Sequence, residues 1–136
     1  MNHEIEVELE APFHDLDPMG VVWHGNYVRY VEVARCALLE KLNYNYDHMA
    51  ASGYAWPVID LKLRYIKPVV FKQKIIVSAA IVEWEYRLKI NYAIRDAVTG
   101  ARICKGYSVQ VAVDVAKQEM LINSPAILLE KLGVKA

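Results

Sequence analysis

The chain has 136 residues, with 16 basic and 16 acidic side chains that give a formal net charge of zero. This length predicts one domain, residues 1–136, whose core is large enough to be stable without a disulfide or a metal ion. A neutral chain lacks the overall positive charge that attracts nucleic acid or an anionic membrane. The two cysteines, Cys36 and Cys104, have no zinc-ligand spacing, which favours reduced thiols in a cytoplasmic protein.

The apolar residues are numerous but dispersed. They make up 55% of the chain, yet no run approaches the roughly 18 residues of a membrane span. The first eleven residues alternate glutamate with apolar residues, unlike a signal peptide. We therefore expect no membrane association, and we expect part of the apolar surface to form the interface of a homodimer or homotetramer.

The first half of the chain predicts a strand followed by a long helix. Residues 4–11 have the two-residue period of a strand with one solvated face. A loop with prolines and glycines, residues 12–25, leads to residues 26–42, where apolar side chains recur every three or four positions. That helix is apolar around most of its circumference, so we expect it to be buried, with Cys36 inside it. Residues 43–57 are irregular and include a short helix near 47–52.

The second half predicts four strands and a closing helix. The strands cover about residues 59–65, 75–81, 86–95 and 102–113, and a Thr99-Gly100 turn joins the last two. In the last strand one face is mainly apolar, and the opposite face carries Cys104, Ser108 and Gln110. Ser124 is the predicted N-cap of the final helix and Pro125 its first residue. One helix with an antiparallel sheet of about five strands is an α+β architecture whose open edges favour an edge-to-edge dimer.

The segment from His14 to Tyr27 contains the groups suited to catalysis. Asp17 precedes Pro18, which restricts Asp17 to extended backbone conformations. Gly20 and Gly25 permit a positive φ or a close approach of the backbone to a ligand. The helix that follows presents unpaired N–H groups at its positive end, equivalent to about half an elementary charge. A carboxylate close to such a helix start is suited to attack on a carbonyl group.

The same segment resembles a known family signature. The pattern D-x-D-P-x-G-x-V-x-x-x-N-Y is formed here by Asp15, Asp17, Pro18, Gly20, Val22, Asn26 and Tyr27. It resembles the hotdog-fold acyl-CoA thioesterases of the 4-hydroxybenzoyl-CoA thioesterase type. The Tyr65-Ile66-Lys67-Pro68 segment resembles the family's Y-x-x-P at a strand end, and Glu83-Trp84 lies where the next hairpin is expected. The resemblance covers about residues 4–115.

The resemblance implies a fold, an assembly and a reaction. The fold is an antiparallel sheet of about five strands wrapped around one central helix. Subunits pair so that each active site lies at a dimer interface, and many members are tetramers. Asp17 would attack the thioester carbonyl or activate the water that does so, while the backbone N–H near His24 polarises the carbonyl oxygen. The products are a free acid and coenzyme A, with no metal and no cofactor other than the coenzyme A of the substrate.

Two sets of candidate site residues follow. The catalytic candidates are Asp17 and His24. The substrate-binding candidates are Gly20, Val21, Asn26, Tyr27, Arg64, Lys67, Arg87 and Lys89.

Each candidate also has a structural reading. His24 contributes its imidazole or only its backbone amide, and Asn26 and Tyr27 cap and pack the helix or contact the substrate. The basic residues either meet the phosphates of coenzyme A or are simply solvated. Asp15 is read as structural, since turn aspartates bind their own backbone. The rings of Trp23, Tyr27 and Tyr30 line an acyl pocket or pack in the core. Both cysteines are read as small apolar residues.

Three functions are compatible with these residues. The first is hydrolysis of an acyl-CoA thioester, with Asp17 as nucleophile or general base. The second is a non-catalytic acyl-CoA-binding hotdog module, and the third is a hydratase or dehydratase acting on acyl thioesters. The carboxylate at position 17 favours the first. The acyl group, and the choice between coenzyme A and an acyl carrier protein, stay open.

Overall fold

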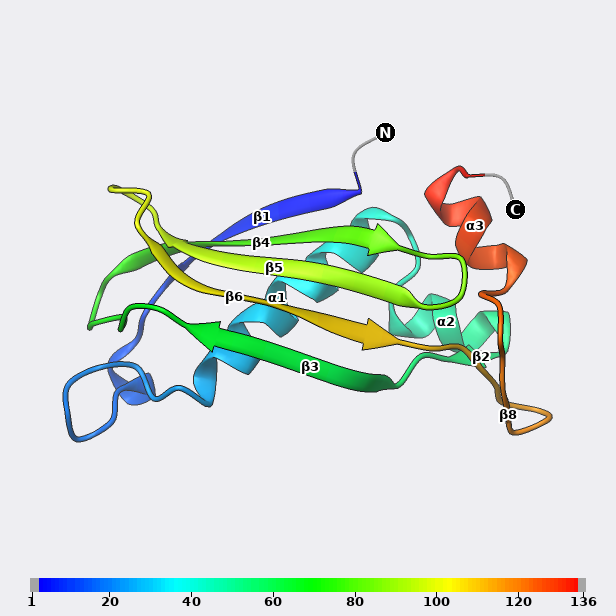
Figure 1. The fold of residues 1–136 in the computed structure, drawn as a ribbon, viewed down its shortest axis with the longest axis horizontal. Helices are drawn as coiled ribbons and strands as arrows, with labels where there is room; N and C mark the ends of the chain where they lie inside the picture. The colour runs from blue at the N-terminus through cyan, green and yellow to red at the C-terminus, as the bar shows by residue number, and fades with distance from the viewer. Residues whose placement is uncertain (1–2, 135–136) are drawn as a thin grey trace.

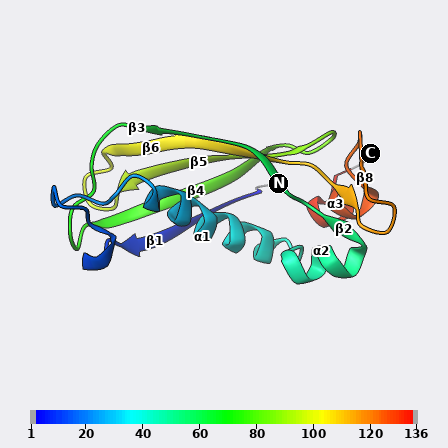
Figure 2. The ribbon, with the colours of Figure 1, turned by 90° about the horizontal axis from the view of Figure 1, so that it is seen from below.

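The computed structural model describes residues 3–134 and is built on a curved antiparallel sheet with one long helix against one face (Figures 1 and 2). The strand order across the sheet is β1-β4-β5-β6-β3, so β1 and β3 are the edges. The predicted α+β hotdog architecture is confirmed. The elements of this main layer are β1 (Glu4–Glu10), α1 (Asn26–Lys41), β3 (Val58–Tyr65), β4 (Lys74–Glu83), β5 (Leu88–Asp96) and β6 (Arg102–Gln110).

A second group of short elements gathers at one end of the sheet (Figure 1). Three two-residue strands form a separate small sheet in the order β2-β7-β8. The sequence did not predict these strands, because two residues are too few to display a period. The elements of this group are α2 (Tyr46–Ser52), β2 (Tyr54–Ala55), β7 (Val113–Asp114), β8 (Glu119–Met120) and α3 (Ala126–Leu132). The 3-10 turn η1 (Phe13–Asp15) belongs to the loop before α1, at the other end of the sheet.

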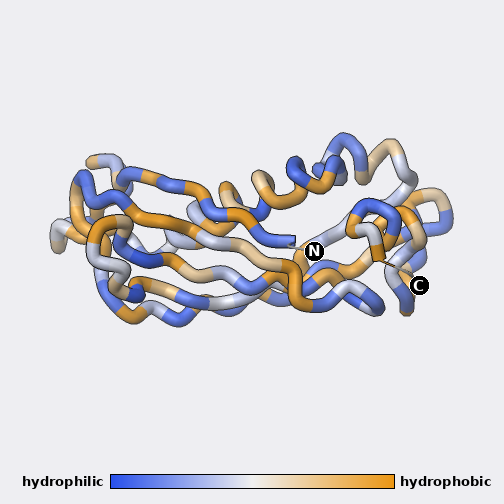
Figure 3. The backbone as a smooth tube through the Cα atoms, turned by 90° about the horizontal axis from the view of Figure 1, so that it is seen from above, coloured by the Kyte–Doolittle hydropathy of each residue, from blue (hydrophilic) through white to orange (hydrophobic). Residues whose placement is uncertain are grey.

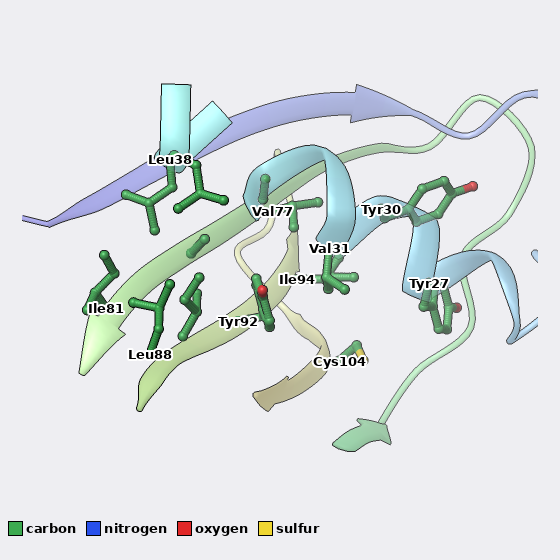
Figure 4. Packing of buried hydrophobic residues seen from close by; sticks show 14 of the residues in the cluster. Tyr27, Tyr30, Val31, Leu38, Val77, Ile81, Leu88, Tyr92, Ile94 and Cys104 are labelled. Atoms are coloured by element: carbon green, nitrogen blue, oxygen red, sulfur yellow. The ribbon is translucent and has the colours of Figure 1, made fainter. Parts of the chain in front are cut away.

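The core lies between α1 and the concave face of the sheet. Apolar and polar residues alternate along the strands (Figure 3), and the apolar set points toward α1. Figure 4 shows Val31 and Leu38 of α1 facing side chains of β4 and β5, such as Val77 and Ile94, all at most 1% exposed. Burying each such side chain stabilises the fold by roughly 1.5–3 kcal/mol relative to leaving it in water.

Within residues 3–134 no helix is long and apolar enough to cross a membrane.

The register of β6 determines which of its faces meets the helix. Ile94 lies opposite Cys104 and Ile90 lies opposite Ser108, so the face with Cys104, Ser108 and Gln110 points toward α1. The polar groups there are paired: the hydroxyl groups of Tyr92 and Ser108 lie 2.7 Å apart. The opposite face, with Tyr107, is the outer face of the sheet. Alternation alone predicted two faces but not which of them is internal.

Two sequence predictions were wrong in detail. Cys36 was expected inside the buried helix, but it is exposed, because only part of the circumference of α1 faces the sheet. Ser124 was expected to cap the last helix with Pro125 as its first residue. Pro125 is instead the N-cap, with an extended backbone at φ −69° and ψ 155°, and no side chain caps this helix. The hydroxyl of Ser124 is buried without a hydrogen-bond partner among the described residues.

The two edge strands have different surroundings. On β1 the apolar side chains are half-buried beside α1, and the alternate positions carry exposed glutamates. Among residues 3–134, strand β3 pairs only with β6, and its other edge is free (Figure 1). Its helix-side residues remain exposed, with Ile59 at 58%, Leu61 at 37% and Tyr65 at 46%. This open edge leads directly to the candidate site.

Candidate active site

The loop before α1 holds Asp17 in a tight turn. The N–H of Gly20 donates to the carbonyl of Asp17 at 3.0 Å, and the N–H of Asp17 donates to the carbonyl of Val21 at 2.8 Å. Gly20 has φ +80°, a conformation that costs residues with a Cβ about 1–2 kcal/mol. The N–H of Met19 donates to Oδ1 of Asp17 at 2.9 Å. The half-buried carboxylate is therefore oriented by its own loop, and within residues 3–134 its other oxygen accepts no hydrogen bond.

Asp15 anchors the same loop from the inside. Its side chain is 3% exposed and accepts hydrogen bonds from the Tyr30 hydroxyl, at 2.6 Å, and from the Arg29 guanidinium. Burial by itself raises the pKa of Asp15, but the bonds from Tyr30 and Arg29 outweigh it and leave the pKa below the ordinary value. Burial, together with the bond to Asp15, raises the pKa of Tyr30 well above its usual value. The reading of Asp15 as structural is consistent with these contacts.

The backbone of Asp15 connects the loop to the start of α1. Its carbonyl accepts the N–H of Trp23 at 2.9 Å and the side-chain amide of Asn26 at 3.0 Å. The N–H of Val22 reaches across to the carbonyl of Val69 at 2.8 Å. The loop, the helix start and the segment after β3 therefore form one hydrogen-bonded unit. Asn26 holds this loop rather than pointing into open space.

A shallow cleft of about 290 Å³ opens between the loop, the first turn of α1 and the end of β3. Tyr27 packs against Tyr65 with ring centroids 5.2 Å apart, and His24 packs against Tyr65 at 5.8 Å. Burial raises the pKa of both tyrosines, so they stay neutral at physiological pH. The cleft is lined by Asp17, Val21, Val22, His24, Tyr27, Tyr65, Ile66, Lys67 and Pro68.

The start of α1 supplies hydrogen-bond donors beside this cleft. The N–H groups of Asn26 and Tyr27 are occupied by the carbonyls of Trp23 and His24, at 2.9 and 3.2 Å. In the described part of the chain, the N–H groups of His24 and Gly25 donate to no protein acceptor. Free donors at the positive end of a helix favour an anion or a carbonyl oxygen that acquires negative charge. The arrangement therefore offers an oriented carboxylate in the cleft and unpaired amides at the helix start, where His24 lines the cleft.

Only some of the predicted site residues line the cleft. Asp17, Val21, His24, Tyr27 and Lys67 all line it. Gly20 lies in the turn, and the side-chain amide of Asn26 binds the Asp15 carbonyl behind the loop, so neither of these two residues lines the cleft.

Three predicted basic residues lie elsewhere. Arg64 and Lys89 are on the outer face of the sheet, where Lys89 Nζ sits 4.6 Å from the centre of the Tyr107 ring. Arg87 lies in the β4–β5 hairpin and pairs with Glu83 at 2.6 Å, in a separate hollow of about 410 Å³. None of the three belongs to the cleft that contains Asp17.

Tyr65 is a lining residue to which sequence reasoning assigned no role. The signal was present, since Tyr65 opens the Y-x-x-P segment and continues the apolar face of β3. Its exposure follows from the edge position of β3, which no local pattern reveals. Of the other aromatic candidates, Tyr30 binds Asp15 and Trp23 is 52% exposed outside the cleft, so only Tyr27 lines it.

Potential metal ligands and the two thiols are placed as follows. Within residues 3–134 no group of three His, Cys, Asp or Glu side chains is placed to hold a metal ion. Cys104 is buried, and burial raises its pKa to about 11, so it stays a thiol at neutral pH. Its reading as a small apolar residue is consistent with that burial. Cys36 is exposed on the far side of α1.

Comparison with known proteins relates this geometry to a family. The chain is 30% identical over 113 residues to the Bacillus subtilis protein named "Putative acyl-CoA thioesterase YneP", an alignment covering 82% of this chain and 81% of the relative. The DHNA-CoA thioesterase of Staphylococcus aureus has a similar structure, with TM-score 0.78 and 28% identity over 88% of this chain and 80% of the other.

More distant structures share the fold. A 1,4-dihydroxy-2-naphthoyl-CoA thioesterase from Synechocystis has TM-score 0.85 at 15% identity, covering 96% of both chains. The sequence profile of the thioesterase-like superfamily matches residues 11–132, which include the whole loop, α1 and four of the five strands of the main sheet, all except β1. The chain therefore belongs to the thioesterase-like superfamily and is a thioester hydrolase with the hotdog fold.

Proposed function

We propose that this thioester hydrolase cleaves acyl-CoA as an enzyme of the 4-hydroxybenzoyl-CoA thioesterase type, with Asp17 as its catalytic carboxylate. The observation that carries the proposal is that Asp17 and His24 line one cleft, while the N–H groups of His24 and of the adjacent Gly25, at the start of α1, have no acceptor among the described residues. A thioester carbonyl between them would have a nucleophile or base on one side and hydrogen-bond donors for its oxygen on the other.

The reaction consumes one water and releases a carboxylic acid and the thiol of coenzyme A. In one route the Asp17 carboxylate takes a proton from water as the hydroxide attacks the carbonyl. In the other, Asp17 attacks directly, the C–S bond breaks, and water then hydrolyses the resulting anhydride. Both routes develop negative charge on the carbonyl oxygen, which the amides at the helix start would stabilise. Neither route uses a metal or a further cofactor.

Aromatic acyl groups are the preferred substrates in this proposal. Tyr27, Tyr65 and His24 present three rings to the cleft, and ring faces pack well against a planar aryl group. The Staphylococcus aureus relative, at 28% identity, is a thioesterase for an aromatic acyl-CoA. The location in the cytoplasm is part of the same proposal.

The decisive experiment measures thiol release from benzoyl-CoA with a thiol-reactive dye. Asp17→Asn should reduce kcat by about 10²–10⁴-fold, the usual contribution of a carboxylate acting as base. Asp47→Asn, a change to an exposed aspartate on α2, is the matched control and should leave kcat unchanged. Full turnover by the Asp17→Asn variant would refute the assigned role. Tight binding of acyl-CoA by the native chain without any hydrolysis would favour the alternative, a non-catalytic acyl-CoA-binding module.

The proposed enzyme is a homodimer or a homotetramer in which two copies meet along β3. The free edge of β3 carries unpaired backbone groups, and its exposed side chains Ile59, Leu61 and Tyr65 are apolar or aromatic. Because Tyr65 also lines the cleft, a second copy at this edge would cover the site. Leu61→Lys should convert the assembly to monomers in analytical ultracentrifugation, whereas Glu8→Lys, at an exposed position on the other edge strand, should not.

A further inference from the structure

The outer face of the sheet, away from α1, has charges of opposite sign at its two edges. The pairing register defines a row across all five strands that runs Glu6, Ser78, Ala93, Lys105, Arg64. The adjacent row runs Glu4, Ala80, Asn91, Tyr107, Lys62. Each row begins with a glutamate on β1 and ends with a cation on β3, about 19 Å away at the usual strand spacing. The zero net charge of the chain conceals this separation.

The positive ends of these two rows, together with Lys89, form a basic stripe, defined as Lys62, Arg64, Lys89 and Lys105. Lys89 lies in the next row, which ends on β3 in Asp60. The side chains of Lys62, Arg64 and Lys105 are exposed and line a hollow of about 460 Å³. In the described part of the chain none of these three forms a salt bridge. Arg64 immediately precedes Tyr65, which lines the active-site cleft together with Lys67. The stripe therefore begins beside the mouth of the cleft.

Edge pairing at β3 would make the stripe larger. Two copies joined there would place their basic stripes side by side in the centre of the outer face, with the glutamates of β1 at the two flanks. Stacking a second such dimer on this face around a two-fold axis would bring one basic centre against the other. Like charges opposed in that way cost binding free energy and suppress association. The outer face is consequently suited to an acidic partner rather than to a copy of itself.

We propose that the basic stripe docks a small acidic protein that presents the acyl group as a thioester on a phosphopantetheine arm. This inference rests on the proposed thioesterase function and adds a protein partner to it. The four cations are spread over three strands, two strand spacings or about 10 Å across. None of them is buried, so the stripe is a surface for a charged protein rather than a pocket for one phosphate. Complementary charge of this kind chiefly accelerates association.

The test compares one acyl group on three carriers: coenzyme A, pantetheine without phosphates, and a bacterial acyl carrier protein. The variant Lys62→Glu/Lys105→Glu reverses two exposed charges of the stripe that do not line the cleft. Lys41→Glu/Lys117→Glu, at two exposed lysines at the end of α1 and in the β7–β8 turn, controls for the same change in net charge. Thiol release reports kcat/KM for each pair of enzyme and substrate, at low and at high salt.

We expect the double variant to lose at least about tenfold in kcat/KM for the acyl carrier protein and to stay within about twofold of the native enzyme for pantetheine and coenzyme A. The native rate on the carrier protein should also fall with added salt. An equal loss of kcat/KM with the coenzyme A substrate would indicate that the stripe binds the phosphates of coenzyme A, and it would overturn the proposal of a protein partner. No loss on any carrier would overturn it too. If the native enzyme cleaves none of the three, the proposed function itself fails.

Discussion

Asp15 and Asp17 are two residues apart in one loop and occupy opposite environments. Asp15 points inward, is 3% exposed, and is fully engaged by Tyr30 and Arg29. Asp17 points to the cleft and is half-buried, and among the described residues its carboxylate accepts a hydrogen bond only from the N–H of Met19. The contrast shows that two aspartates of one D-x-D sequence can differ in role: Asp15 anchors the loop, and Asp17 is the candidate reactive group. Extended backbone at Leu16, with φ −80° and ψ 146°, turns successive side chains to opposite sides and so separates the two.

The largest expected difference in stability is between variants of the two carboxylates, Asp15 and Asp17. Asp15→Asn should lower the free energy of unfolding by about 2–3 kcal/mol, because it leaves a buried network without its charge. Asp17→Asn should change it by less than about 0.5 kcal/mol, as a partly exposed residue with one local bond. Urea denaturation of both variants gives the two values. Equal losses would contradict the division of roles.

Gly20→Ala tests whether the turn around Asp17 depends on a positive φ. The substitution should destabilise the protein by about 1–2 kcal/mol, since no atom lies near the added Cβ and only the backbone is strained. Gly100→Ala, at φ +75° in the β5–β6 turn, is matched in strain and in free space. Both should reduce Tm, but only Gly20→Ala should also reduce kcat. An unchanged kcat would mean that the turn does not orient the carboxylate.

Tyr30→Phe removes a single hydrogen bond to Asp15. We expect a loss of about 1–1.5 kcal/mol, the value of a bond to a charged group, with Asp15 still paired to Arg29. Tyr107→Phe removes a long, exposed bond to Asp60 at 3.3 Å and should cost almost nothing. Thermal unfolding of the two variants would show whether the inward side of the loop depends on this contact.

The smallest expected effect is the dependence on pH of the stabilisation that the ionised Asp15 side chain provides. The pKa of Asp15 in the folded protein lies below its ordinary value of 3.8, so the folded state favours the ionised form. The resulting stabilisation is fully present above pH 3.8 and is lost as the pH falls through the folded pKa. The difference in unfolding free energy between the native chain and Asp15→Asn should therefore shrink only in that acidic range. A difference that is constant with pH would contradict the charged state assigned to Asp15.

The long elements could be predicted from the sequence because their periods extend over many residues. The helix predicted at 26–42 is observed at Asn26–Lys41, and the short helix near 47–52 is observed at Tyr46–Ser52. The two-residue strands β2, β7 and β8 could not be predicted, since no period exists in so short a segment. The exposed Cys36 could not be predicted either, because helical spacing does not say how much of a circumference the sheet covers.

The residues of the candidate site were likewise predicted only in part from the sequence. The D-x-D-P-x-G pattern located the loop and its reactive candidate, and the structure places Lys67 in the same cleft. The placement of Arg64, Arg87 and Lys89 away from the cleft depends on strand register and on the hairpin. Gly106 is a further example: a Cβ there would lie 1.9 Å from the carbonyl of Lys62 on the neighbouring strand. No local pattern in β6 signals that close approach.

The sequence by itself determined the order of strands and helix, the turn around Asp17 and the candidate carboxylate, because these depend on backbone preferences and on periods within one segment. Only the tertiary structure decided that Tyr65 joins the cleft, that Asp15 is buried against Tyr30, and that the charges on the outer face separate toward the two edges. Those features arise from the register between strands distant in the chain. Register is set by packing of the whole sheet against α1, which no single segment contains.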